Sequence, residues 1–313
     1  MDFSSCELPP GCGKAKEVHR TMPARISLWR SLPFFLVHLS SLSIFWCGWS
    51  RVALWLCAIL YLVRMFGITA GYHRYFSHRS YSTSRWFQFT LAWVGASAMQ
   101  KGPLWWAANH RHHHTHSDDD ADIHSPVQNG FWWSHVGWIL TTKYDATNFR
   151  LISDLAKYPE LRWLNRYWLV PPVALAQGLL VLGWVLQRHF PHWGTSPVQM
   201  LAWGFFVNTV LVYHGTFSVN SLTHVFGSRR FPTTDNSRNS FWIAVLTLGE
   251  GWHNNHHYVP SSERQGFYFW EVDIAHYMLV SLSSLGLVWD LQKPPRHVLN
   301  KTAWLPEGIG GRL

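Results

Sequence analysis

Four long apolar stretches constrain the fold of this chain more than any other feature. They cover about Leu28–Trp49, Arg51–Ala70, Tyr167–Gln187 and Val198–Asn220. Roughly 20 helical residues cross the ~30 Å hydrocarbon layer of a bilayer, so each stretch is long enough to span a membrane. Tight connections join the stretches in pairs. The sequence therefore predicts an all-α integral membrane protein with four transmembrane helices in two hairpins.

Composition agrees with a membrane location. Hydrophobic residues make up 48% of the chain and charged residues only 14%, whereas soluble domains have about 25% charged residues. The 21 Trp residues suit the two faces of a bilayer, where indole rings lie between hydrocarbon and headgroups. The net charge of +9 fits anionic lipid or an acidic substrate, and no basic run with interleaved aromatic residues indicates nucleic acid.

Basic residues indicate which side of the membrane is cytosolic, because Lys and Arg are enriched in short cytosolic segments. Five of them lie in residues 1–30, ten in residues 71–166 and eight in residues 224–313. The hairpin loops and their ends hold only Arg51 and Arg188. We therefore expect cytosolic termini and a cytosolic helical cap. Arg64, inside the second span, is expected to extend its charge to the interface.

We expect a single domain at residues 28–300, between tails at 1–27 and 301–313. Two shorter apolar stretches, Trp86–Met99 and Ile274–Val288, contain Ser, Gly or His. They suit helices that lie in the membrane interface or against the cap.

The 20 histidines are unevenly distributed, and ten of them fall in three runs, "HRYFSH", "HRHHHTH" and "HNNHH". In order, the runs hold His73 and His78; His110, His112, His113, His114 and His116; and His253, His256 and His257. All three runs lie on the side expected to be cytosolic. Isolated histidines such as His38, His214 and His276 are expected to be packed or hydrogen-bonded residues.

Helical spacing divides the second run, because residues i, i+3 and i+4 share one face of a helix. Two sets have this spacing: His110, His113 and His114, and His253, His256 and His257. His112 and His116 fall on another face and are assigned to solvent or supporting roles. With the first run, eight convergent histidines exceed the four ligands of a closed zinc site, which indicates two adjacent metals. Imidazole binds Zn, Cu, Fe and Ni alike, so the ligand type does not identify the metal.

Five segments resemble the membrane-bound fatty acid desaturase family, in particular its acyl-CoA delta-9 branch. They are "GITAGYHRYFSHRSY" at 67–81, "NHRHHHTHSDDDADIHS" at 109–125, "FWWSHVGWIL" at 131–140, "VNSLTHVFG" at 219–227 and "GEGWHNNHH" at 249–257. Their order and spacing also match the family, over residues from about 50 to 290. A single histidine run would also fit alkane hydroxylases or sterol desaturases.

The resemblance implies a non-haem di-iron centre with nine histidine ligands and an asparagine that holds a metal-bound water. The ligands are then His73, His78, His110, His113, His114, His224, His253, His256 and His257, and the asparagine is Asn220. The assignments of His224 and Asn220 rest on the resemblance alone.

Removal of hydrogen from a saturated chain requires a stronger oxidant than any side chain, so a redox metal and O2 are expected. Electrons would come from a separate donor, such as ferredoxin or cytochrome b5 with its reductase.

Carboxylates near the histidine runs have two alternative roles. Metal-bound histidines usually donate their other ring N–H to a carboxylate or a carbonyl. We expect this supporting role for Asp122 and Glu250. Asp118, Asp119 and Asp120 either support ligands in the same way or form a solvated acidic turn, and the sequence leaves both alternatives open.

The resemblance also implies a bent tunnel for the acyl chain. Its bend is lined in the family by a Trp before the second histidine run and a Thr-Trp pair before the asparagine. Trp106, Thr216 and Phe217 stand at these positions, so a phenyl ring replaces one indole. Several charges that bind coenzyme A in the animal enzymes are missing, and Lys143 and Arg150 are our headgroup candidates.

We therefore expect an oxidoreductase that uses O2 to introduce a cis double bond at delta-9 of a saturated long-chain acyl-CoA. An acyl-lipid desaturase and a di-iron hydroxylase of acyl or alkane chains are the enzymatic alternatives. A histidine-rich metal transporter or store is the alternative of another class, but its ligands would lie within the spans.

The short chain favours a bacterial cytoplasmic membrane over the endoplasmic reticulum.

Overall fold

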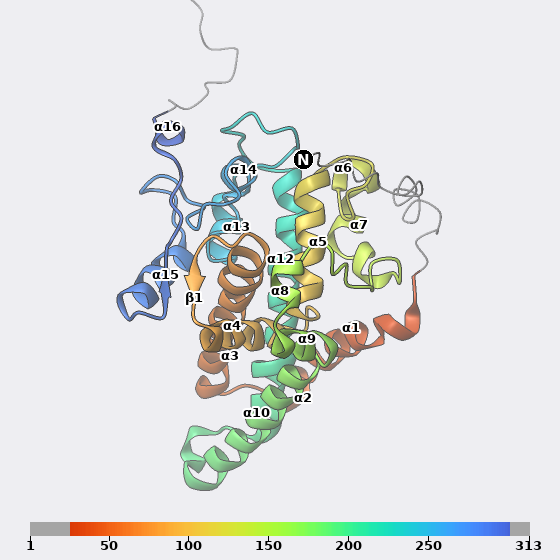
Figure 1. Cartoon of the computed structure of the whole chain (residues 1–313). Helices are drawn as coiled ribbons and strands as arrows, with labels where there is room; N and C mark the ends of the chain where they lie inside the picture. The colour runs from red at the N-terminus through yellow and green to blue at the C-terminus, as the bar shows by residue number, and fades with distance from the viewer. Residues whose placement is uncertain (1–25, 301–313) are drawn as a thin grey trace, which may run out of the picture.

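The computed structural model describes residues 26–300 and is mostly helical (Figure 1). Its first half contains α1 (Leu28–Ser41), α2 (Ile44–Cys47), α3 (Arg51–Phe66), the π-helix η1 (Gly67–Ser77), α4 (Arg85–Ser97), α5 (Pro103–His116), α6 (Pro126–Asn129), α7 (Phe131–His135) and η2 (Gly137–Leu140). Its second half contains α8 (Ser153–Ala156), α9 (Pro159–Arg166), α10 (Val170–His189), η3 (Pro191–Trp193), α11 (Pro197–Leu201), the π-helix η4 (Ala202–Val207), α12 (Asn208–Ser221), η5 (Leu222–His224), α13 (Phe241–Leu246), α14 (His253–Tyr258), α15 (Ile274–Ser284) and α16 (Arg296–Leu299). Strands β1 (Ser82–Thr83) and β2 (Val288–Trp289) form a small antiparallel ribbon. The tails expected at 1–27 and 301–313 lie almost entirely outside the described residues.

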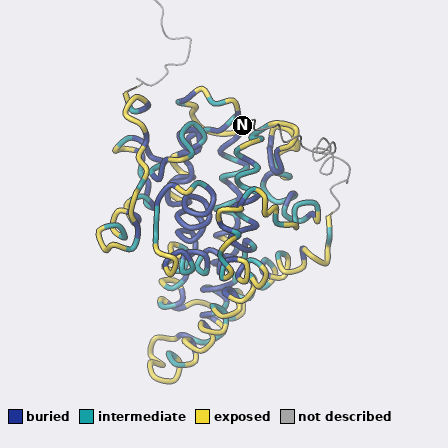
Figure 2. Tube along the Cα trace, in the orientation of Figure 1, coloured by how far each residue is buried: buried dark blue, intermediate teal, exposed yellow. Residues whose placement is uncertain are grey.

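Three helices within residues 26–300 are long and apolar enough to cross a membrane: Leu28–Cys47, Arg51–Ser77 and Val170–His189. Large apolar side chains on them are exposed, for example Trp46 at 82% and Trp55 at 71%. Figure 2 shows the same exposure along α10, which reaches the lower end of the molecule, and along α1, which runs out to the right. Contiguous apolar surface of this kind is unfavourable in water and suits hydrocarbon. These helices agree with the predicted all-α membrane protein.

Two predicted spans differ from the observed helices. The second extends to Ser77 rather than ending at Ala70, because α3 passes directly into η1. The fourth, predicted at 198–220, is helical as α11, η4 and α12, but it is not among the three candidate spans of the described chain. Part of its buried surface is polar, since Asn208 and Thr209 are fully buried. The four-span topology and the cytosolic cap stay predictions.

The main core lies where η1, α4 and α5 pack together, in the dark blue centre of Figure 2. η1 is buried along its whole length. Gly95 allows α4 to approach η1 closely, because a Cβ there would lie 2.4 Å from Cε1 of Tyr72. The apolar stretch predicted at 86–99 therefore buries one face against the histidine-bearing π-helix.

The position of Arg64 contradicts the expectation that its charge extends to the membrane interface. Its side chain does not extend to an interface but is buried, with 1% of the residue exposed. It donates hydrogen bonds to Asn208 Oδ1 at 2.7 Å, Thr209 Oγ1 at 2.8 Å and the carbonyl oxygen of Ser97 at 2.6 Å. Buried charges persist in proteins where hydrogen bonds replace water, and the polar face of α12 and the end of α4 supply them here.

Candidate metal centre

The second histidine run lies on α5, and its helical faces separate as predicted. His113 is buried, with 2% exposed, and faces the interior. His112 and His116 lie on another face, with ring centroids 4.6 Å apart. His112 Nε2 lies 2.9 Å from the carbonyl oxygen of Ala121, and His116 pairs with Asp119 at 2.9 Å. These two imidazoles therefore point away from the interior set.

The third run forms α14, which two buried asparagines anchor from the other side. Asn254 Oδ1 accepts hydrogen bonds from the backbone N–H groups of Arg230 and Phe231, both at 2.7 Å. Asn255 donates to Glu271 Oε2 at 2.9 Å. Because the asparagines occupy the face opposite the i, i+3, i+4 positions, these bonds fix the direction in which the histidines point.

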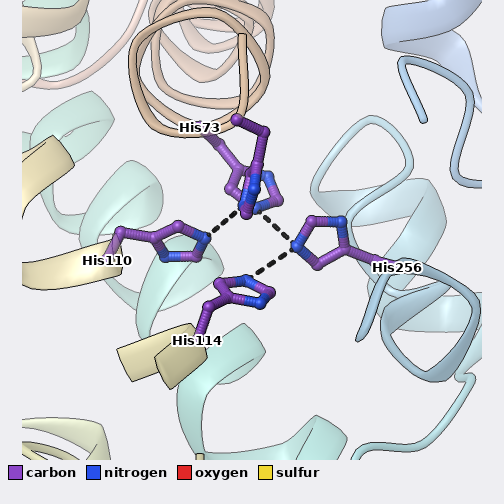
Figure 3. A group of neighbouring side chains, drawn as sticks. His73, His110, His114 and His256 are labelled. Atoms are coloured by element: carbon purple, nitrogen blue, oxygen red, sulfur yellow. Dashed lines mark hydrogen bonds between the residues drawn. The ribbon is translucent and has the colours of Figure 1, made fainter. Parts of the chain in front are cut away.

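Five imidazoles converge in what we call the five-histidine cluster: His73, His78, His110, His114 and His256. Their ligand atoms all lie within 4.8 Å of one another. The Nε2 atoms are 2.8 Å apart in His78 and His110, and 2.9 Å apart in His114 and His256. Figure 3 shows four of these rings pointing toward a common centre, from η1, α5 and α14.

Four further imidazoles converge in the adjoining four-histidine cluster: His113, His224, His253 and His257. The Nε2 atoms of His224 and His253 are 3.1 Å apart. His224 comes from η5, at the end of α12, and is 3% exposed. The structure thus brings together all nine histidines that the resemblance implied as ligands.

The two histidine-bearing helices contribute to both clusters in opposite proportions. α5 gives the i, i+4 pair His110 and His114 to the five-histidine cluster and His113 to the other. α14 gives the i, i+4 pair His253 and His257 to the four-histidine cluster and the remaining histidine to the other. Spacing predicted that each set of three shares a face, and the structure divides each set between two neighbouring centres.

Carboxylates lie behind four of the nine imidazoles. The pairs, each through Nδ1, are His73 with Glu250, His113 with Asp122 at 3.0 Å, His224 with Asp118 at 3.0 Å, and His257 with Asp235 at 2.6 Å. An ionised carboxylate can only accept a hydrogen bond, so the hydrogen lies on Nδ1 and Nε2 keeps its lone pair. This arrangement is the usual one behind metal-bound histidines.

The acidic run after the second histidine run separates into different environments. The Asp118 side chain is 4% exposed and also accepts hydrogen bonds from Ser125 Oγ at 2.6 Å and Asn236 N at 2.7 Å. Burial opposes ionisation of Asp118, but its hydrogen bonds from His224, Ser125 and the backbone N–H of Asn236 outweigh burial and lower its pKa to about 2. Asp119 is exposed and pairs with His116. Asp118 thus lies behind a histidine, as in the supporting role, whereas Asp119 belongs to a solvated acidic turn.

Most of the clustered imidazoles favour their neutral form; in His113 the carboxylate of Asp122 outweighs burial and raises the pKa. Burial, followed by the neighbouring imidazoles, lowers the pKa well below its usual value in His78, His110, His114, His253 and His256. Neutral imidazole is the form that binds metals. Since protonation is disfavoured here, proton binding competes little with a metal for these nitrogens.

The nitrogen atoms fit a metal better than they fit one another. Nε2 of His256 lies 3.0 Å from Nε2 of His73 and 2.9 Å from Nε2 of His114. A neutral ring carries one hydrogen, so three facing nitrogens cannot all be satisfied by hydrogen bonds. Nε2 of His257, whose Nδ1 pairs with Asp235, is buried without a hydrogen-bond partner. A cation in each cluster would bind these lone pairs, and an all-imidazole donor set suits iron.

A cavity of about 140 Å³ leads to the five-histidine cluster. The three predicted tunnel residues, Trp106, Thr216 and Phe217, all line it. His110 lies at its inner end and stacks on Trp106, with ring centroids 5.0 Å apart. Asn220 lines both this cavity and a smaller one bounded by histidines of both clusters. Asn220 therefore lies next to metal-binding groups of both clusters, and its role as holder of a water stays a prediction.

The cations at the cavity are not the predicted ones. Lys143 and Arg150 do not line it, whereas Arg30 and Lys101 do. Both of these cations pair with one carboxylate, Asp145. α1 and the turn after α4 bring them together, and no sequence spacing connects these two segments.

Sequence reasoning missed Asp235. This residue lies in the irregular segment between η5 and α13, in "TTDNS", where no periodicity links it to His257. Burial opposes its ionisation, but the hydrogen bond from His257 lowers its pKa strongly. Asp118 was visible in the acidic run, but only its burial distinguishes it from Asp119 and Asp120.

Comparisons with known proteins cover most of this chain. Residues 49–284 match the fatty acid desaturase family. The chain is 38% identical to an sn-2 palmitoyl-lipid 9-desaturase of Nostoc sp. (strain 36), over 85% of this chain and 91% of that protein. It is 39% identical to an sn-1 stearoyl-lipid 9-desaturase of Anabaena variabilis, over 84% and 93%. It is 36% identical to an acyl-CoA 5-desaturase of Anemone leveillei, over 86% and 82%. The chain therefore belongs to the fatty acid desaturase family, whose members are oxidoreductases of lipid metabolism.

Proposed function

We propose that this protein introduces a cis double bond at delta-9 of a saturated fatty acyl chain, using O2 and two irons. The observation that carries the proposal is that the five-histidine cluster borders a largely apolar cavity through His110, with the four-histidine cluster adjoining it. The delta-9 position is supported by relatives named as 9-desaturases. Two electrons per turnover would come from a separate donor protein.

In this proposal, the nine histidines hold the two irons, and Asn220 holds a water on one of them. The irons, when bound, supply the oxidising chemistry that side chains lack. The protein supplies position and a dry site. Asp118, Asp122, Asp235 and Glu250 keep four ligand rings in one tautomer and one orientation, because each accepts the Nδ1 hydrogen.

The cavity would hold the acyl chain with its saturated methylenes beside the clusters. Trp106 and Phe217 provide apolar walls, and Thr216 is held in place by Gln100, whose Nε2 donates to its hydroxyl at 2.9 Å. Two adjacent carbons must lie next to the metals for a double bond to form, so a rigid wall favours one position. Exclusion of water from this cavity also prevents side reactions of the oxidant.

A lipid-bound acyl chain fits the polar end of the cavity better than acyl-CoA. Arg30 and Lys101 share the single carboxylate Asp145, so the net charge there is about one positive unit. Coenzyme A carries several phosphate charges, which arginine and lysine side chains must neutralise. Acyl-CoA remains the second candidate, supported by the acyl-CoA 5-desaturase relative, with Lys143 and Arg150 as its outer cations.

The proposed location is a bacterial cytoplasmic membrane, with the endoplasmic reticulum as the alternative. The termini and the metal centre would be cytosolic, and the segment at 198–220 would form the fourth span of a domain at 28–300. Figure 1 supports this orientation, since α14 and the far end of α10 lie at opposite ends of the molecule.

A lipid profile tests the function. The full chain, expressed in a desaturase-deficient host supplied with saturated fatty acids, should produce new monounsaturated chains, detected by gas chromatography with mass spectrometry. Hydroxylated chains without new double bonds would support the hydroxylase alternative instead. Purified enzyme with a reducing system should then act on phospholipid vesicles and not on acyl-CoA, and the reverse preference would overturn the choice of carrier.

A further inference from the structure

A third group of histidines lies outside both metal-binding clusters. His38 of α1, His214 of α12 and His135 of α7 form a chain, with His38 Nε2 3.1 Å from His214 Nε2 and His214 Nδ1 3.0 Å from His135 Nε2. Their nitrogens lie in a row and do not converge on one point. The geometry is therefore that of a hydrogen-bonded chain rather than a metal site.

One carbonyl sets the direction of the two hydrogen bonds between the neutral rings. His38 Nδ1 lies 2.7 Å from the carbonyl oxygen of Phe34, which can only accept, so Nδ1 donates and Nε2 accepts from His214. His214 Nδ1 then accepts from His135 Nε2. His135 Nδ1 lies 2.9 Å from the hydroxyl oxygen of Ser221, which donates to the carbonyl oxygen of Phe217 at 3.0 Å. Neutral His38 and His214 thus each donate one hydrogen bond and accept one. Burial lowers the pKa of His135, in agreement with a neutral chain.

The chain lies directly behind the aromatic wall of the cavity. Phe34 and Phe217 line the cavity. The ring centroids of Phe34 and His38 are 4.2 Å apart, and Phe217 lies 5.9 Å from His135 and 6.0 Å from His214. The wall therefore depends on these three imidazoles for its position.

The helices joined by the chain both line the cavity. α1 provides Arg30, whose side chain is 66% exposed, and α12 provides Asn220, which also lines the smaller cavity beside the clustered histidines. A substrate held by its polar head near Arg30 is oxidised at the carbons that reach the clusters. The number of carbons between these two points is therefore set by how α1 sits on α12.

We propose that the His38–His214–His135 chain fixes the position of the double bond by locking α1 and α7 onto α12. This proposal rests on the proposed desaturase function. The three histidines are positioning residues, since they act through Phe34, Phe217 and the helices that carry them. A displacement of about 1 Å is sufficient to misplace a reacting atom, so loss of the chain changes which carbons meet the metal centre.

The test compares product positions made by the full-length protein and its variants in the same desaturase-deficient host. His38→Phe, His135→Phe and His214→Phe keep a planar ring and remove the hydrogen bonds. His192→Phe, an exposed ring in η3 at the far end of α10, is the matched control. Double-bond position is read by mass spectrometry of derivatised methyl esters, as a ratio among products, so it is independent of protein amount.

Each of the three variants should raise the ratio of displaced to wild-type double bonds by about tenfold, given the sensitivity of reactions to ~1 Å shifts. The double variant His38→Phe with His135→Phe should give the same ratio as either single variant, because each already breaks the chain. An unchanged ratio would overturn the proposal, as would complete loss of product in all three variants, which would assign the chain to folding. Absence of double bonds with the wild-type protein would instead overturn the proposed function.

Discussion

The two histidine clusters differ in what holds their imidazoles from behind. In the four-histidine cluster, three of the four rings donate Nδ1–H to a carboxylate: Asp118, Asp122 and Asp235. In the five-histidine cluster, only His73 has such a partner, Glu250. Carboxylate partners fix the tautomer, orient the ring and make it a stronger ligand. Carboxylates thus orient most rings of the four-histidine cluster. The five-histidine cluster has one more imidazole but only one carboxylate behind it.

The two clusters also differ in their position relative to the cavity. The five-histidine cluster borders the acyl cavity through His110. The four-histidine cluster lies on the side of the buried aspartates and has no contact with the larger cavity. We infer that the four-histidine cluster is the more rigid metal site, because carboxylates hold its rings. The five-histidine cluster is then the site whose surroundings change when substrate enters the cavity. The following experiments challenge that distinction, from the largest expected effect to the smallest.

Removal of one ligand should have the largest effect. We expect His113→Ala and His256→Ala to reduce desaturation below detection, because each opens one of the two clusters. Iron analysis of the purified variants should show loss of about one of the two irons, by the ligand count of each cluster. Normal activity in either variant would contradict the assignment of that histidine.

Acid should destabilise the metal-free protein. Burial lowers the pKa of His257 from 6.5 to about 4, despite its hydrogen bond to Asp235. Between these values the unfolded chain binds a proton that the folded chain does not, so the free energy of unfolding falls as the pH falls. The loss is about 3 kcal/mol for this residue, at ~1.4 kcal/mol per pKa unit.

Thermal unfolding in detergent with a chelator, measured between pH 7 and pH 4, checks this expectation. His257→Gln should flatten the pH dependence because it removes the titrating group. An equal slope in the variant and the parent protein would show that other groups dominate.

Loss of a supporting carboxylate should have an intermediate effect. Asp118→Asn and Asp235→Asn remove the negative charge behind the four-histidine cluster, and such changes cost about 10- to 100-fold in metal affinity or activity. Asp119→Asn is the matched control, because Asp119 is adjacent in sequence but exposed. Iron retention during dialysis against a chelator gives the affinity, and similar losses from Asp118→Asn and Asp119→Asn would remove the proposed distinction.

Substitution of His112 should have the smallest effect. Its ring lies on the outer face of α5, against the carbonyl oxygen of Ala121. We expect His112→Ala to retain activity within about twofold, because loss of one net hydrogen bond costs only ~1 kcal/mol. Turnover and iron content measured beside those of His113→Ala provide the comparison, and equal loss in both would refute the division of the second run by helical face.

The helices and the histidine set could be predicted because their causes are local. Apolar length predicts a span, and the i, i+3, i+4 spacing of His110, His113 and His114 predicts a shared face. Both follow from the geometry of a single helix. The boundary of the second span was harder to predict, because packing of η1 against α4, rather than hydropathy, extends the helix to Ser77.

Contacts between distant segments could not be predicted in this way. Asp235 reaches His257 through an irregular loop, Arg30 and Lys101 meet at Asp145, and Arg64 turns inward to polar groups of α12. Each contact depends on how two separately formed segments dock, which no periodicity along the chain encodes.

The sequence by itself determined that this protein has membrane-spanning helices, two sets of histidines on helix faces and a desaturase pattern, because short-range geometry controls these features. Only the tertiary structure decided how the nine histidines divide into five and four, which carboxylates stand behind them, and that three further histidines join α1, α7 and α12. These outcomes depend on the packing of separately formed elements, which in the case of His38 and His214 lie 176 residues apart, and there burial and hydrogen bonding select a single arrangement.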